Sequence, residues 1–86
     1  MEKHTILGVH VKSRVKTAGN IQKILTEFGC AIKTRIGLHD VTPDACSPSG
    51  VILLELVGDD AEIQKLAQKL GAVQGVEAKL MVFEGA

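Results

Sequence analysis

Three side chains of the sequence could hold a transition metal: His10, His39 and Cys46. Imidazole nitrogen and thiolate sulfur are ligands that such metals favour, and two subunits meeting across one surface could bring the three groups together. The interval between His39 and Cys46 matches no zinc motif. Two surface histidines and a loop thiol are therefore the alternative interpretation, and His4, close to the terminus, is expected to play no part.

A second chemical feature is the polar stretch 13–20, predicted to connect the first strand to the first helix. Free amide groups and the dipole of a helix N-terminus attract anions, so Arg14 and Asn20 are candidate contacts for a small acidic effector. Cys46 and Ser47, in a turn-rich segment, are further candidates. The alternative is a solvated helix start and an ordinary exposed thiol, because no cation adjoins Cys46 to activate it.

Catalysis is not predicted by any group of residues. The serines lack a G-x-S-x-G setting, and the sequence contains no P-loop, no C-x-x-C and no H-E-x-x-H. The two cysteines do not form a disulfide framework. We expect reduced thiols, with Cys30 as a small core residue. The sequence thus predicts a non-enzymatic protein, and no cofactor is assigned to it.

The hydrophobic pattern predicts the elements that must position these groups. Alternation predicts strands at 5–13, 30–39 and 76–83, and a nearly continuous apolar run predicts a central strand at 51–57. Helical spacing predicts helices at about 16–28 and 59–71. Residues 40–50 contain both prolines and predict a long loop. The inward side chains of the second strand are expected to be Cys30, Ile32, Thr34, Ile36 and Leu38.

The element order β-α-β-β-α-β predicts an α+β fold of the ferredoxin-like plait type. Two β-α-β halves with right-handed crossovers give a four-stranded antiparallel sheet in the order 4-1-3-2, with both helices on one face. We expect one domain covering residues 1–86.

The other face of this sheet is predicted to be apolar. An exposed patch of this kind usually marks an interface, so we expect a homo-oligomer that uses this face or an edge strand, with a partly exposed sheet face as the alternative. Its expected interface residues are Ile6, Leu53, Met81 and Phe83. The same face is expected to display Gly8, His10 and Val51, beside Lys33, Arg35, Glu55 and His39.

Composition excludes other classes. Lys+Arg and Asp+Glu both number 10, so the formal net charge is +0, which argues against direct contact with nucleic acid. The sequence has no apolar run of the length that a membrane span needs and no signal-peptide pattern. We expect a cytoplasmic protein.

The first half of the sequence resembles ACT-type regulatory domains. The resemblance rests on Val11-Lys12-Ser13-Arg14, on the helix that ends in Glu27-Phe28-Gly29, and on Ala31-Ile32-Lys33. It implies the same plait and a small effector bound at a subunit interface. Val15 and Lys16 stand where that family commonly has Pro-Gly, which is a departure at the amino-acid pocket.

Nearly the whole chain is similar to a family of short bacterial proteins, the regulators of the iron-only hydrogenase system. The segments that carry the similarity are 33–39, 46–52, 54–59 and 75–83. The resemblance implies an oligomeric, effector-sensing module, with a metal-responsive protein or a protein–protein adaptor as alternatives. The family also resembles the effector domain of nickel-responsive repressors. Those carry a DNA-reading segment before the plait, so direct operator binding is not expected here.

Overall fold

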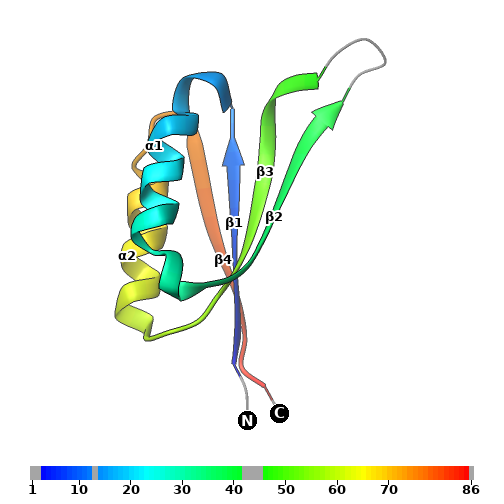
Figure 1. Cartoon of the computed structure of the whole chain (residues 1–86). Helices are drawn as coiled ribbons and strands as arrows, with labels where there is room; N and C mark the ends of the chain where they lie inside the picture. Colours follow the sequence, from blue (N-terminus) through cyan, green and yellow to red (C-terminus); the bar gives the residue numbers. More distant parts are fainter. Residues whose placement is uncertain (1–2, 13, 42–45, 86) are drawn as a thin grey trace.

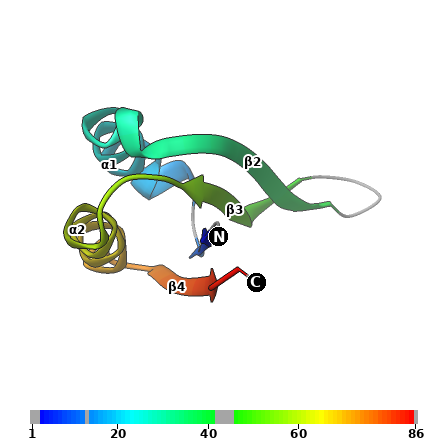
Figure 2. The same ribbon diagram turned by 90° about the horizontal axis from the view of Figure 1, so that it is seen from below.

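The fold is a single antiparallel sheet with both helices on one side. The computed structural model describes residues 3–12, 14–41 and 46–85, and for residues 14–18, 38–41 and 46–49 it describes the backbone alone. Within these residues the four strands lie in the order β2-β3-β1-β4, and Figures 1 and 2 both show the two helices on one face. This confirms the predicted α+β plait. The elements are β1 (His4–Val11), α1 (Arg14–Glu27), a 3-10 helix η1 (Gly29–Ala31), β2 (Ile32–Val41), β3 (Cys46–Leu56), α2 (Asp60–Gly71) and β4 (Val76–Phe83).

Strand β1 follows the predicted alternation. Leu7, Val9 and Val11 are at most 2% exposed and face the helices, while Ile6 and His10 are half-buried on the opposite face. This alternation is the pattern of a strand with one face against a core. β1 lies at the centre of the sheet, paired with β3 on one side and β4 on the other. It therefore fixes which residues of three strands share a face.

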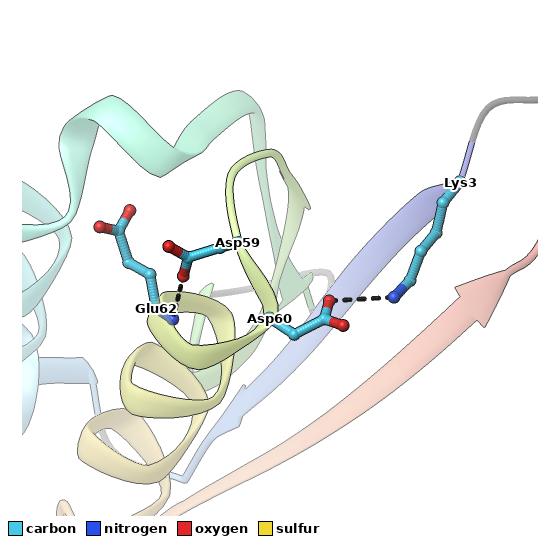
Figure 3. A network of polar contacts seen from close by, with 4 residues as sticks. All are labelled: Lys3, Asp59, Asp60 and Glu62. Atoms are coloured by element: carbon cyan, nitrogen blue, oxygen red, sulfur yellow. Dashed lines mark hydrogen bonds and ion pairs between the residues drawn. The ribbon is translucent and has the colours of Figure 1, made fainter.

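Helix α2 covers the predicted range, with Asp59 as its N-cap. The Asp59 carboxylate accepts a hydrogen bond from the backbone N–H of Glu62 at 2.8 Å, which caps the helix (Figure 3). Asp60 accepts a hydrogen bond from Lys3 at 2.9 Å and so connects the start of α2 to the start of β1 (Figure 3). This hydrogen bond raises the pKa of Lys3 above its ordinary value. The buried residues of the helix are Ile63, Leu66 and Leu70.

Helix α1 begins earlier than predicted. It starts at Arg14, so most of the stretch interpreted as a turn is helical, and Ser13 lies outside the described residues. Ile21, Leu25 and Phe28, which recur at helical spacing, are buried against the sheet. Lys69 of α2 forms an ion pair with Glu27 at 2.7 Å and joins the two helices at this end.

The start of β2 differs from the sequence prediction. Cys30 is exposed and lies in η1, whereas Ala31 is only 1% exposed. The Ala31 N–H donates to Phe28 O, and Ala31 O accepts from the Val57 N–H. These bonds hold Ala31 in the core, and regular pairing begins one residue later.

An irregularity in β2 then reverses its predicted faces. Ile32 pairs with Leu56, but Thr34 pairs with Glu55, so one extra residue is inserted in β2, as in a β-bulge. Because a shift of one residue moves every following position to the other face, the prediction that Thr34 and Ile36 face the helices is wrong.

The β2–β3 hairpin is longer than predicted. β2 continues to Val41, which pairs with Cys46, so the described part of the expected 40–50 loop is strand and residues 42–45 lie outside the described residues. The pairing of β1 with β3 ends at Val11 and Gly50. Residues 46–49 therefore extend past β1, and this first part of β3 lies away from the helices (Figure 1). Pro48, which has no N–H to donate, fits a strand segment that pairs on one side.

Candidate functional site

The face of the sheet that the helices leave uncovered is here called the open face. It is apolar along its centre, where Ile6, Val51 and Leu53 are half-buried, and more exposed toward its two edge strands. There Ile36 is 50% exposed, Met81 52% and Phe83 53%. By the strand register the open face consists of His4, Ile6, Gly8 and His10, Thr34 and Ile36, Val51, Leu53 and Glu55, and Glu77, Lys79, Met81 and Phe83.

The four residues predicted as an interface occupy one side of the sheet. Met81 is the cross-strand partner of Ile6, and Leu53 is the partner of Gly8. Phe83 is the next open-face residue of β4 and pairs with His4. A contact with another subunit through these residues remains a prediction.

A polar cluster interrupts the apolar part of the open face. Glu55 accepts a hydrogen bond from the Thr34 hydroxyl at 3.2 Å, and its second carboxylate oxygen is 3.5 Å from Nδ1 of His4. The Glu55 side chain retains 26% of its accessible surface. Sequence reasoning missed this cluster and set His4 aside. His4 lies diagonally across from Glu55, and only the strand register brings the two residues together.

The three predicted metal ligands are distributed over different register positions. His10 pairs with Val51 and Glu77, whereas His39 pairs with Gly50. Neighbouring positions of β3 belong to opposite faces, so the register does not give the shared face expected for His10 and His39. The cause is the irregularity in β2.

Cys46 is the first residue of β3 and pairs with Val41. The structure does not describe its side chain or that of His39. Among the described side chains, no group of three or more His, Cys, Asp or Glu residues could hold a metal ion.

The predicted effector contacts do not form one turn. Arg14 is the first residue of α1 and Asn20 its seventh, so the helix separates their Cα atoms by about 9 Å along its axis. The Asn20 side chain is exposed, and that of Arg14 is not described. Ser47, like Cys46, belongs to the part of the hairpin that extends past β1.

A cleft that the sequence did not predict lies where β1 ends and β4 begins. Its volume is about 420 Å³, and it is lined by His10, Lys12, Gly75, Val76 and Glu77. The Lys12 N–H donates to Gly75 O at 2.9 Å and fixes one wall, and Gly75 adopts a φ of +81°, which favours glycine. Its lining includes a lysine, a histidine and a glutamate, and the Glu77 carboxylate also lies 3.8 Å from Nζ of Lys79. Its residues are distant in sequence and meet only through the β1–β4 register.

The fold defines the class of protein. The ACT domain from the GTP pyrophosphokinase of Chlorobium tepidum superposes with a TM-score of 0.65 at 18% identity, covering 91% of this chain and 96% of that chain. A nitrogen regulatory PII-like protein, CPII from Thiomonas intermedia K12, superposes in its apo form with a TM-score of 0.59 at 8% identity, covering 98% of this chain and 92% of that chain. At these identities the likeness is one of fold, and the fold is ACT-like.

A family model identifies the chain more closely. The model described as "TM1266-like: Iron-only hydrogenase system regulator, putative" matches residues 3–80, and the chain belongs to this family. The uncharacterized protein TM1266 from Thermotoga maritima superposes with a TM-score of 0.80 at 28% identity, covering 96% of this chain and 100% of that chain. No curated protein sequence matches significantly.

Family and fold together indicate a regulatory role. In the described part of the chain, no helix is both long enough and apolar enough to cross a membrane.

Proposed function

We propose that the protein is a non-catalytic, oligomeric regulatory module of the iron-only hydrogenase system, which senses a small effector and signals to a partner protein. The observation that carries this proposal is the match of the regulator family over residues 3–80 on an ACT-like fold. The module is one cytoplasmic domain spanning residues 1–86. It acts on its targets through protein contacts rather than by binding nucleic acid.

The cleft between β1 and β4 supports a location for the effector. Lys12 and His10 provide hydrogen-bond donors, and Glu77 provides an acceptor. A small polar molecule with both an anionic and a donor group has the chemistry to fit between them. Arg14, the first residue of α1, stays a predicted contact of the effector on the sequence argument alone. Asn20, Cys46 and Ser47 receive no comparable support from the cleft.

An effector regulates such a module only if it binds one arrangement of the subunits more tightly than another. A ligand shifts an equilibrium by its difference in affinity for the two arrangements of the subunits. The cleft contains His10 and Glu77 of the open face. A second subunit on that face would therefore alter the cleft, and an effector in the cleft would in turn alter the association.

Equilibrium binding tests this function. Purified protein, kept anaerobic, is titrated separately with amino acids, nucleotides and divalent metals up to millimolar concentration. We expect one organic class to bind with about one molecule per subunit, and we expect Lys12→Ala to weaken that binding about tenfold or more, since it removes a charge-assisted hydrogen bond. Lys65→Ala, on the exposed side of α2, is the matched control and should bind normally.

Two results would contradict the proposal. Binding of no organic ligand in any class would remove the sensing role and favour a protein–protein adaptor. Uptake of one metal ion per subunit that is lost in His39→Ala would replace the effector by a metal and favour the metal-responsive alternative.

A further inference from the structure

The open face has the dimensions of a small protein–protein interface. β1 and β4 each contain eight residues, so the face is about 26 Å long and about 19 Å wide at ordinary strand spacing. Its footprint is then about 500 Å² on each subunit, and two such faces in contact would bury about 1,000 Å² or more. This is the lower limit of what specific association requires.

The charges of the open face suit a second copy of the same chain. On β4, Glu77 lies 3.8 Å from Lys79, so this carboxylate has a cationic neighbour on its own strand. Glu55 has His4 as its neighbour, which is charged only when protonated. With both histidines neutral, the face carries a net charge of about −1 from Glu55, Glu77 and Lys79; one added proton brings it to about zero. Two identical faces therefore repel each other weakly or not at all once a proton is bound.

The polar cluster allows Glu55 to be covered without being left unpaired. Covering a carboxylate is costly unless its oxygens keep hydrogen-bond partners. Thr34 serves one oxygen of Glu55, and His4 lies beside the other. Both partners belong to the same subunit, so they stay in place when a second sheet packs over the face.

We infer that the open face binds a second copy of this chain, sheet against sheet, and that the cluster of Glu55, Thr34 and His4 makes this association dependent on protonation. The inference rests on the proposed oligomeric function and names its partner and its regulation. A dimer that covers Glu55 favours the protonated His4, because the imidazolium neutralises the carboxylate where water is excluded. The dimer therefore takes up one proton for each subunit as it forms.

The direction of the pH effect follows from this proton uptake. Because the dimer favours the protonated imidazole, the association is strongest at mildly acidic pH and weakens as the pH rises. Among the described side chains, the other charged groups near this part of the sheet do not pair with Glu55. Lys3 bonds to Asp60, Arg35 bonds to Gln22, and Lys33 is an exposed cation at the irregularity of β2. On β4, Glu77 and Lys79 are separated from Glu55 by β1, and His10 lies at the opposite end of β1.

Sedimentation of the full chain at about pH 6 and about pH 8 tests the inference. We expect the dissociation constant to be at least about fivefold higher at the higher pH. His4→Gln should reduce this ratio to near one, whereas Lys65→Gln, on the exposed side of α2, should preserve it. Glu55→Gln should also abolish the ratio, while keeping an acceptor for Thr34.

A pair of neighbouring residues on β4 tests the surface itself. Met81 is 52% exposed on the open face, and Val82 is 45% exposed on the opposite face. Met81→Asp should raise the dissociation constant about 30-fold or more by placing an unpaired charge in the interface, and Val82→Asp should leave it within about threefold. Circular dichroism on both variants verifies that each is folded.

The outcomes separate this inference from the proposed function. A monomer at every pH and concentration, an oligomer that Met81→Asp leaves intact, or a pH ratio unchanged in His4→Gln would each overturn the inference, even if an effector still binds. A proton-dependent dimer that binds no organic effector would support the inference and contradict the proposed function.

Discussion

The two faces of this sheet consist of alternate residues of the same strands, but one face is buried under the helices and the other is uncovered. On the helix side Leu7 and Leu54 are completely buried. One position along β1 or β3, Ile6 and Leu53 remain half-buried, and at the edge of the open face more than half of Phe83 is exposed. The helices complete one core and leave a second apolar layer uncovered. The face under the helices therefore provides the folding core, and the open face is available for association.

The largest effect is expected from a core residue compared with an open-face residue. Leu66 is 0% exposed in α2, and Leu66→Ala should lower the free energy of unfolding by about 3 kcal/mol, because it leaves a cavity. Phe83→Ala should cost less than about 1 kcal/mol in dilute protein, since the ring is already largely in water. Urea unfolding monitored by circular dichroism measures both. Equal losses would mean that the open face contributes to folding as the core does.

A smaller loss of stability is expected from the residue that caps α2, compared with its exposed neighbour. Asp59→Ala removes the acceptor of the Glu62 N–H and should destabilise the protein by about 1 kcal/mol. Asp60→Ala, the adjacent control, removes an exposed ion pair with Lys3 and should have the smaller effect of the two. The order of the two urea midpoints decides the matter, and the reverse order would refute the assignment of Asp59 as the cap.

A smaller effect is expected at Gly8, in the middle of the open face. A Cβ at this position would meet Leu53 Cδ2 and Lys79 O at 3.8 Å, which is ordinary contact. Gly8→Ala should therefore stabilise the monomer by about 0.5 kcal/mol, because glycine loses more backbone entropy on folding. Thermal unfolding of dilute protein tests this expectation. A destabilised variant would mean that the centre of the face is more closely packed than the structure has it.

The smallest expected effect is the pH dependence of the Lys3–Asp60 ion pair. Because the pKa of Lys3 is raised by the Asp60 hydrogen bond, the stabilisation is fully present at neutral pH, below the pKa of the unfolded chain, and is lost as the pH rises through the raised alkaline pKa. The stability difference between the natural protein and Lys3→Met should shrink over that range. A difference that stays constant at alkaline pH would show that the pair contributes nothing.

The sequence predicts most of the fold because β1, β4 and both helices each keep one hydrophobic period, and because β3 contains a nearly continuous apolar run. β1, α2 and β4 are each marked by an unbroken pattern that ends in a turn residue. In β2 the alternation predicts the wrong face. Ile32 and Ile36 are four residues apart, so regular alternation would place them on the same face, but they lie on different faces. The hydrogen bonds of Ala31 and the extra residue before Thr34 cause the reversal, and neither leaves a signal in the residue types.

The candidate sites are predicted less completely than the fold. Ile6, Met81 and Phe83 could be assigned to one face because the residues of their strands alternate, whereas Leu53 lies in a nearly continuous apolar run whose one polar residue is Glu55. The Glu55–His4 contact and the cleft of Lys12 and Glu77 depend on strand register, which follows from pairing across the whole sheet. The proline-containing hairpin was predicted as a loop, since the sequence gives no sign that the strands continue past the end of β1.

Native mass spectrometry of the anaerobically purified protein tests the central claim most directly, because it reports subunit number and bound ligand together. A regulatory module of the proposed kind gives an oligomer of the chain that retains, or takes up stoichiometrically, one small organic molecule per subunit. A bare monomer that binds nothing, or an oligomer that takes up one metal ion per subunit and no organic ligand, would contradict the account.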